Sequence, residues 1–584
     1  MAGTGTAPPG GAAPSGGTDP YAAQVEAVRA GYGTAGPALE LGALLVDAGG
    51  TPTPRPDVPV RIPLSMLTRH GLVAGATGTG KTKTLQVMAE QLSAAGVPVF
   101  LADIKGDLSG IAVTGTASDG VVSRARATGQ DWQATASPTE FLALGGLGTG
   151  VPVRASISSF GPDLLARVLD LNATQTSSLA LVFHHADTAG LPLLDLADLR
   201  AVVQHLVSDE GKADLVDLGG LSKATAGVIL RELVAFAAAG ADAFFGEPEL
   251  DPAELLRVDA EGRGIVTCLE LAEVQDRPAL FSTFLLWLLA ELFESLPEVG
   301  DLDRPKLVFF FDEAHLLFTG ASKTFLEKIT QTVRLIRSKG VGIVFVTQTP
   351  EDVPGDVLAQ LGSRVQHALR AYTPDDAKAL RATVSTFPTS GYDLGALLTS
   401  LGTGEAVVTV LSERGAPTPV AWTMLRAPQG SMSPMPADAL GSAVAASPLM
   451  ARYGVEVDRE SAYEMLSARL GSGTAVPADR TRGRTPDRTR GRAPSSADQD
   501  VDEDEDRDRG ADGLPGPGES WDDVEPARRG TRTPAPRRRA PREERGAVQE
   551  VLASPAVRGF LRSAGTALGR EITRGIFGTA RRRR

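Results

Sequence analysis

Residues 75–82 carry the clearest chemical signature in the chain. They read Gly-Ala-Thr-Gly-Thr-Gly-Lys-Thr and match the pattern G-x-x-x-x-G-K-[ST] at every fixed position. Glycines allow backbone N–H groups to turn toward phosphate oxygens, Lys81 can reach the β- and γ-phosphates, and the Thr82 hydroxyl can bind Mg²⁺. We therefore predict that ATP binds here with Mg²⁺. The predicted binding residues of this loop are Gly75, Ala76, Thr77, Gly78, Thr79, Gly80, Lys81 and Thr82.

The segments on either side of this loop suit the same chemistry. Residues 69–74 run into it as a short apolar strand, and residues 85–92 leave it with the apolar periodicity of a helix. A glycine-rich turn that carries a lysine by chance would lack this strand–loop–helix context. The helix N-terminus behind the loop adds partial positive charge for the phosphates.

Two carboxylates follow a second apolar run far downstream. Residues 307–311 are Leu-Val-Phe-Phe-Phe, and Asp312 and Glu313 come next. An unbroken apolar run is typical of a strand buried on both faces of a parallel sheet. We expect Asp312 to hold Mg²⁺ directly or through water, and Glu313 to polarise the attacking water as general base.

A third buried strand is predicted over residues 341–347, and Gln348 follows it. A glutamine at this point can orient the attacking water or contact the γ-phosphate, as glutamines do in other phosphoryl-transfer sites. The alternative is an ordinary turn before Pro350.

Together these motifs resemble those of the HerA–FtsK superfamily of P-loop motor ATPases, and within it the YjgR-type HerA-like proteins. The resemblance is carried by residues 69–82, 101–110 and 360–370 and covers about residues 38–465 and the C-terminal segment. It implies a RecA-like, ATP-driven motor that assembles as a hexameric ring. HerA itself is a DNA-end-processing translocase that works with a nuclease, so double-stranded DNA and a nuclease are the partners that the resemblance implies.

The resemblance also draws attention to an acidic segment and to two groups of arginines. HerA-like proteins carry an acidic residue after the second strand, so Asp103 or Asp107 could assist the water or the metal; a capped turn is the alternative. Ring ATPases place an arginine against the γ-phosphate of the neighbouring subunit. Arg334 and Arg337 are our first choice for this role, the competing candidates are Arg364 and Arg370, and an arginine paired at the surface is the alternative for each.

These motifs together provide a set of candidate site residues. The predicted catalytic residues are Glu313, Gln348, Lys81, Arg334 and Arg337, the predicted metal ligands are Thr82 and Asp312, and the additional nucleotide-binding candidates are Asp103 and Asp107.

Composition limits the class and the compartment of the protein. The net charge of −13 argues against tight non-specific binding of DNA by the whole surface, although a basic channel inside a ring would not alter that sum. The lone cysteine, Cys268, lies in an apolar run and points to a core thiol and a reducing compartment. Residues 280–290 are apolar but too short for a membrane span, so we expect a buried core helix and a cytoplasmic protein.

The predicted fold class is α/β: a RecA-like P-loop NTPase core with a mostly parallel sheet, a large helical insertion, a disordered tail and a C-terminal amphipathic helix. The predicted organisation is a disordered N-terminus (1–20), a short β element with the first part of the core (38–111), a mostly helical insertion (112–300), the second part of the core (301–465), a disordered polyampholyte linker (466–546) and a basic amphipathic helix (547–584).

We therefore expect an ATPase, and the family resemblance implies that DNA stimulates it and that its hydrolysis drives DNA translocation. A nucleotide-gated scaffold is the alternative from another class: its ATP state would control assembly and the recruitment of a protein or membrane partner. A small-molecule kinase is a third option, disfavoured by the long helical insertion.

Overall fold

The computed structural model describes residues 21–470 except 48–49 and 320–321. The predicted N-terminal segment 1–20, the C-terminal helix 547–584 and all but the first five residues of the predicted linker lie outside the described residues.

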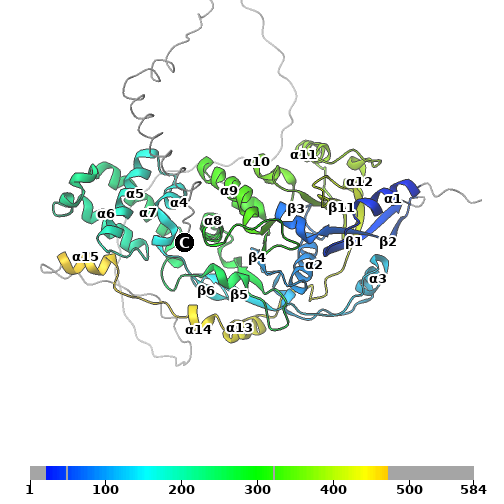
Figure 1. Ribbon diagram of the computed structural model, residues 1–584, viewed down its shortest axis with the longest axis horizontal. Helices are drawn as coiled ribbons and strands as arrows, with labels where there is room; N and C mark the ends of the chain where they lie inside the picture. The colour runs from blue at the N-terminus through cyan, green and yellow to red at the C-terminus, as the bar shows by residue number, and fades with distance from the viewer. Residues whose placement is uncertain (1–20, 48–49, 320–321, 471–584) are drawn as a thin grey trace, which may run out of the picture. The chain divides into compact units, whose positions relative to one another are not determined.

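Within the described residues, twelve strands form one sheet in the order β2-β1-β12-β11-β10-β3-β9-β8-β4-β7-β5-β6 (Figure 1). The strands are β1 (Ala38–Asp47), β2 (Pro52–Pro63), β3 (Gly71–Ala74), β4 (Val99–Asp103), β5 (Thr139–Leu144), β6 (Val151–Val153), β7 (Val266–Glu270), β8 (Leu307–Phe311), β9 (Val341–Thr347), β10 (Ser363–Gln366), β11 (Glu405–Thr409) and β12 (Ala421–Leu425). Every pairing from β10 to β6 is parallel, and the pairings of β11, β12, β1 and β2 are antiparallel. The predicted α/β core with a mostly parallel sheet is confirmed.

Helices cover the sheet and form a group at its β6 end (Figure 1). Their bounds are α1 (Ala22–Gly31), α2 (Lys81–Ala94), α3 (Asp119–Thr128), α4 (Ile157–Val168), α5 (Ala173–Thr188), α6 (Leu196–Val207), α7 (Lys223–Ala238), α8 (Pro278–Ser295), α9 (Lys323–Ile336), α10 (Gly355–Leu358), α11 (Pro374–Ser385), α12 (Leu394–Ser400), α13 (Ala437–Ala446), α14 (Met450–Tyr453) and α15 (Ala462–Leu470).

Strand β8 shows why the central strands carry unbroken apolar runs. Successive side chains of a strand point to opposite faces of its sheet. Phe309 and Phe311 belong to the apolar cluster that contains α8 and α9, whereas Val308 and Phe310 belong to the cluster that contains α2. Both faces of β8 are therefore covered, as expected for a parallel sheet with helices on each side.

Helices α4 to α7 make up a helical group between β6 and β7. Asn172 begins α5 and Asp195 begins α6 through capping boxes, with Gln175 and Asp198 as the reciprocal partners. The expected insertion 112–300 is broader than this group, because it also contains β5, β6 and β7. These three short strands belong to the sheet, and helices α3 and α8 of the same span lie outside the helical group, before β5 and after β7.

Helix α8 is the one helix in the described part of the chain that is long and apolar enough to cross a membrane by length and composition. Most of it is buried inside the protein, where Phe284, Trp287 and Leu288 pack in the core. The burial agrees with the expected core helix.

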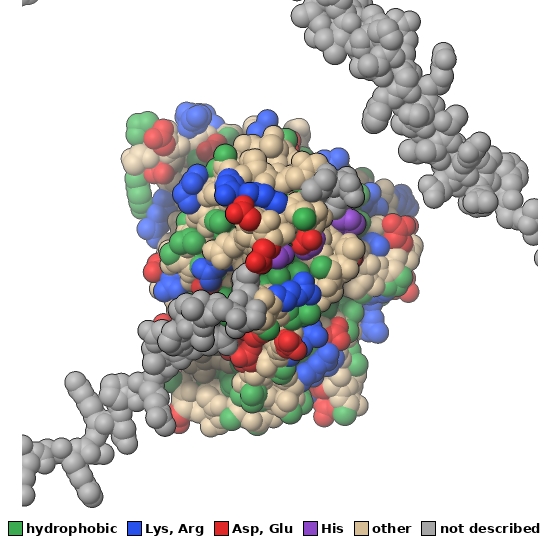
Figure 2. Space-filling model, turned by 90° about the vertical axis from the view of Figure 1, so that its left-hand side faces the viewer, with side chains coloured by type: hydrophobic (Ala, Val, Ile, Leu, Met, Phe, Trp, Pro, Cys, Tyr) green, Lys and Arg blue, Asp and Glu red, His purple; other side chains and the backbone are tan. Residues whose placement is uncertain are grey.

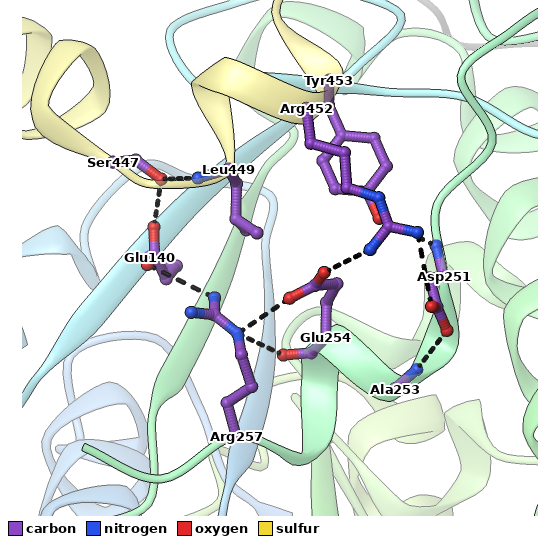
Figure 3. A network of polar contacts seen from close by, with 9 residues as sticks. All are labelled: Glu140, Asp251, Ala253, Glu254, Arg257, Ser447, Leu449, Arg452 and Tyr453. Carbon is purple, nitrogen blue, oxygen red and sulfur yellow. Dashed lines mark hydrogen bonds and ion pairs between the residues drawn. The ribbon is translucent and has the colours of Figure 1, made fainter. Parts of the chain in front are cut away.

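Polar contacts hold the segment after the sheet against β5 and the chain that precedes β7 (Figure 3). Arg257 contacts Glu140 of β5 at 3.3 Å and Glu254 at 3.0 Å, and Arg452 of α14 contacts Glu254 at 2.6 Å. The Ser447 hydroxyl donates a hydrogen bond to the other oxygen of Glu140. Residues 447–453 are thereby tied to the far half of the sheet.

Candidate functional site

The phosphate-binding loop joins β3 to α2, as its sequence predicts. Gly75, Gly78 and Gly80 have φ values of 155°, 79° and 110°, a region that favours glycine. Gly75 is also closely packed, because a Cβ atom there would lie 2.4 Å from the Cβ of His367. The glycines of the motif therefore allow the loop to turn, and Gly75 also allows the residue after β10 to pack closely against the loop.

Strands on both sides hold this loop in place. The N–H of Gly75 donates to the carbonyl of Thr347 at 3.2 Å, at the end of β9, and the N–H of Ala76 donates to Ala368 at 2.8 Å, just beyond β10. Farther along the loop, the Thr79 carbonyl accepts a hydrogen bond from the N–H of Gly404 at 3.0 Å. The loop is thus fixed by backbone contacts before any ligand binds.

Lys81 lies folded over the loop in a largely buried position. Its Nζ donates to the carbonyl of Ala76 at 3.3 Å. Burial lowers the pKa of Lys81, although the negative charges of Glu313 and Asp312 oppose that change. The lysine and the two carboxylates predicted from distant parts of the sequence therefore share one electrostatic environment.

Asp312 follows β8 directly and is almost fully buried. Its Oδ2 atom has no hydrogen-bond partner among the described residues, and burial raises its pKa to about 7. A buried carboxylate oxygen without a partner, together with the half-buried Thr82 hydroxyl, is the hard oxygen donor set that Mg²⁺ prefers. These residues fit the predicted metal site.

Glu313 has a left-handed backbone, with φ of 45°, and forms an ion pair with Lys105. Its other carboxylate oxygen lies 3.2 Å from Nδ1 of His315. Burial alone would raise the pKa of Glu313, but the hydrogen bond and charge of Lys105 outweigh burial and lower it. The predicted general base is therefore held as an anion.

Lys105 is the residue that the sequence reasoning missed. It lies in the turn after β4, and β4 pairs in parallel with β8, so both strands end at the same edge of the sheet. Burial tends to lower the pKa of Lys105, but its hydrogen bond with Glu313 more than compensates and raises it. One feature of the sequence could have identified Lys105 as a site residue: it lies two residues after Asp103, at the end of a buried strand.

The two acidic candidates of this turn have different surroundings. The Asp103 carboxylate is fully buried and accepts hydrogen bonds from the N–H groups of Gly106 and Leu108, both at 2.8 Å, and at longer distance from Lys105 and Asp107. Burial raises its pKa to about 6. Asp103 thus has the contacts of the capped-turn alternative and shapes the turn that carries Lys105. Asp107 keeps one buried oxygen without a hydrogen-bond partner in the described part of the chain.

Gln348 is exposed at the end of β9. Because β9 lies between β3 and β8 in the sheet, the structure places Gln348 between the phosphate-binding loop and Asp312. Its neighbours are fixed: the Thr347 hydroxyl and the Thr349 N–H both donate to Asp352, at 2.7 and 2.8 Å. The contact of Gln348 with the γ-phosphate stays a prediction.

The candidate arginines lie at two opposite edges of the sheet, which the sequence did not reveal. Arg334, Arg337 and Arg364 line one hollow of about 600 Å³ together with Arg69. Arg69 precedes β3, Arg337 precedes β9 and Arg364 is the second residue of β10, so the hollow lies at the amino ends of the parallel strands, opposite the phosphate-binding loop. Arg370 instead donates to the Thr77 carbonyl of that loop at 3.3 Å.

A parallel sheet with helices on both faces, a phosphate-binding loop after β3 and acidic residues after β8 define a P-loop nucleotide-binding ATPase. Residues 51–514 match the model of the family described as Helicase HerA-like C-terminal, and the chain belongs to that family. The predicted relationship to HerA-like ATPases is confirmed.

Solved structures with a similar fold share little sequence with this chain. The unbound bacterial conjugative coupling protein TrwB is 16% identical over 70% of this chain and 94% of its own, with a TM-score of 0.45. TrwB in complex with ADP and Mg²⁺ is 17% identical over 68% and 97%, with a TM-score of 0.44. VirB4 of Thermoanaerobacter pseudethanolicus is 14% identical over 68% and 98%, with a TM-score of 0.43. No curated protein sequence matches the chain.

Proposed function

We propose that this protein is a Mg²⁺-dependent motor ATPase that assembles into a ring, a hexamer, and translocates double-stranded DNA in the cytoplasm. The observation that carries the proposal is the meeting of Lys81, Asp312 and Glu313 at one edge of the sheet, with Gln348 between their strands. Membership of the HerA-like family supports the motor activity.

In this proposal each candidate site residue at this edge of the sheet has a distinct role in ATP hydrolysis. The backbone N–H groups of residues 75–80 and Lys81 hold the phosphates. Thr82 and Asp312 would hold Mg²⁺, which when bound neutralises phosphate charge and favours attack at the γ-phosphate. Glu313 accepts the proton of the attacking water, and Gln348 orients that water or contacts the γ-phosphate.

The arginine hollow supports assembly into a ring. It lies at the opposite edge of the sheet from the phosphate-binding loop of the same chain, so Arg334 or Arg337 can act on a nucleotide only if that nucleotide is bound by another subunit. A head-to-tail contact that closes on itself produces a ring. Neither arginine forms an ion pair with an acidic side chain in the described part of the chain, which leaves both free for an external phosphate.

The surface beside the helical group does not suit a long polyanion. Figure 2 shows acidic and basic side chains mingled on the part of this face that the described residues form. We therefore place DNA contact elsewhere, within the ring, and regard the helical group as a surface for a protein partner such as a nuclease.

Steady-state ATP hydrolysis, measured with and without linear double-stranded DNA, tests this function. We expect the wild-type rate to rise with DNA, and Lys81→Ala to remove hydrolysis in both conditions. Hydrolysis that depends on Lys81 but ignores DNA, combined with assembly that responds to ATP, would replace the motor with the nucleotide-gated scaffold. Sedimentation with and without ATP tests the ring, and a monomer in both states would contradict it.

A further inference from the structure

The arginine hollow carries positive charge that the described residues do not neutralise. Arg69 and Arg364 are half-buried in its wall, and Arg334 and Arg337 are exposed there. The described lining contains no Asp or Glu, and none of the four arginines forms an ion pair with an acidic side chain in that part of the chain. Guanidinium groups around one volume repel one another, and an anion between them relieves the repulsion. By its charge, the hollow is an anion site.

Arg364 has the clearest need for a partner. Its guanidinium donates to the carbonyl of Thr386 at 3.3 Å, which leaves most of its N–H donors without an acceptor among the described residues. Burial lowers the pKa of Arg364, and no carboxylate of the described chain opposes that change. A half-buried cation without a counter-ion is unfavourable until an anion reaches it.

Hydrogen bonds hold the segments that carry these arginines in a fixed arrangement. The His70 ring donates from Nε2 to the carbonyl of Val333 in α9 at 2.7 Å and accepts at Nδ1 from the N–H of Ile343 in β9 at 3.1 Å. The N–H of Gly362 donates to the carbonyl of Arg69 at 2.9 Å. His70 also has a φ of 63°, a conformation that side chains rarely adopt and that clusters at functional sites. The hollow is therefore held in shape by the fold.

One part of the wall is apolar. It consists of Phe387, Pro388, Leu411 and Pro417. Gly362 lets Leu411 approach, because a Cβ atom at Gly362 would lie 2.6 Å from Cδ1 of that leucine. An aromatic or aliphatic group placed against this part of the wall would lose contact with water, which favours binding.

The size of the hollow favours a small molecule. Its volume of about 600 Å³ lies within the range of about 300–1,000 Å³ usual for small-molecule sites. An inorganic phosphate ion would leave most of this volume and all of the apolar wall unused. A strand of nucleic acid would need a basic surface that extends beyond one hollow.

We propose that the arginine hollow binds a small phosphorylated molecule that also carries an aromatic or aliphatic group. Its phosphate contacts Arg364 and Arg69, and its apolar part packs against Phe387 and the prolines beside it. This binding does not depend on the proposed function. Its consequence rests on the proposed function: a ligand in the hollow withholds Arg334 and Arg337 from the nucleotide of the neighbouring subunit, and so inhibits hydrolysis.

Naphthyl phosphate is a suitable probe. It joins a phosphate group to a flat apolar ring, and it has no β- or γ-phosphate for the loop at residues 75–82. Its binding to the full chain should be measured by calorimetry, with naphthol as the matched ligand without phosphate. We expect wild type to bind naphthyl phosphate at least about tenfold more tightly than naphthol.

Four variants locate the site. Arg364→Met should weaken binding of naphthyl phosphate by about tenfold, whereas Lys81→Ala and Arg381→Met should bind it within about twofold of wild type. Phe387→Ala should weaken binding of naphthyl phosphate by about fivefold and leave binding of inorganic phosphate within about twofold. Because Arg364 has no counter-ion, Arg364→Met should unfold at a urea concentration no lower than wild type, which shows that its loss of binding is not a loss of folding.

Three results would overturn the proposed site: no binding by wild type, equal binding by Arg364→Met, or loss of binding in Lys81→Ala, which would place the probe at the phosphate-binding loop. Displacement of the probe by a double-stranded oligonucleotide would also overturn it and assign the hollow to DNA.

Steady-state hydrolysis tests the consequence separately. Naphthyl phosphate should lower kcat for ATP and leave KM within about twofold, because it removes an arginine from the transition state and leaves the loop unoccupied. Binding without inhibition would contradict the proposed consequence. A wild-type protein that does not hydrolyse ATP would contradict the proposed function, and the binding measurements would still decide whether the hollow is a ligand site.

Discussion

Lys105 and Glu313 form an ion pair across the ends of two neighbouring parallel strands, β4 and β8. The positive charge of Lys105 keeps Glu313, the proposed general base, ionised. The same contact leaves one carboxylate oxygen of Glu313 bound to Lys105. Under the proposed function, we expect a phosphate bound at the adjacent loop to compete for Lys105, because it offers a second anion to the same ammonium group. The protonation of Glu313 would then depend on whether the loop is occupied.

Removal of the Lys105 charge should change the pH dependence of hydrolysis. Lys105 lowers the pKa of Glu313, so the Lys105→Met variant should have a higher pKa at Glu313 and lose activity at a higher pH than wild type. The measurement is kcat/KM between pH 5 and 8. Lys323→Met, at an exposed lysine, is the control and should leave the profile unchanged. An acidic limb that does not move in Lys105→Met would separate Lys105 from the base.

Glu313→Gln should abolish turnover and retain ATP binding. The substitution keeps the size of the side chain and removes the proton acceptor, a loss of about 10²–10⁴-fold for a general base. Calorimetric ATP binding and steady-state hydrolysis, measured on the same preparation, check both parts. Turnover near the wild-type rate would exclude Glu313 as the base.

Asp312→Asn should stabilise the metal-free protein at alkaline pH and abolish Mg²⁺-dependent hydrolysis. Burial raises the pKa of Asp312 from 3.8 to about 7, so the folded state binds this proton more tightly than the unfolded state. Stability is therefore lost as pH rises from about 4 to 7, and the full penalty is present above 7. At pH 8 we expect the free energy of unfolding of the Asn variant to exceed that of wild type by about 4 kcal/mol.

Urea unfolding in the presence of a chelator is the measurement for Asp312. The difference between variant and wild type should shrink at pH 5, where folded Asp312 is already protonated. A difference that is the same at both pH values would show that ionisation of Asp312 is not its cause.

Arg337→Ala and Arg334→Ala should each be tested for action between subunits. Loss of an arginine that contacts the transferring phosphoryl group lowers the rate by about 10³–10⁵-fold. If the arginine acts in trans, a mixture of Arg337→Ala and Glu313→Gln proteins should regain activity, because some interfaces then combine an intact base with an intact arginine. Arg381→Ala, at an exposed surface position, is the control. A mixture as inactive as its parents would place the arginine in cis or outside catalysis.

The sequence predicted the parts of the site that depend on local pattern. The loop at residues 75–82 and the strand before Asp312 both have a signature within a few neighbouring residues, and the structure places them as expected. The role of Lys105 depends on the pairing of β4 with β8, which are separated by about two hundred residues in the chain, and no local pattern encodes that pairing. The sharing of one hollow by Arg334 and Arg364 depends in the same way on which strands begin side by side.

Asp103 illustrates a limit of another kind. Its sequence context suited both a nucleotide-facing acid and a capped turn, because the same residue types serve both. Only the backbone path after β4, with N–H groups turned onto the carboxylate, distinguishes the two.

Strand β10 has a mechanical consequence. Its four residues carry Arg364 near one end and lead, at the other, to His367 and Ala368, which contact the phosphate-binding loop. At about 3.3 Å per residue, the strand spans about 13 Å and connects the arginine hollow to the phosphate-binding loop. Packed interiors yield little to compression, so under the proposed function a shift of the loop on phosphate release would be transmitted to the hollow. In a ring of such subunits, a movement of the phosphate-binding loop in one subunit would reach the arginines that face the next subunit through this one short strand.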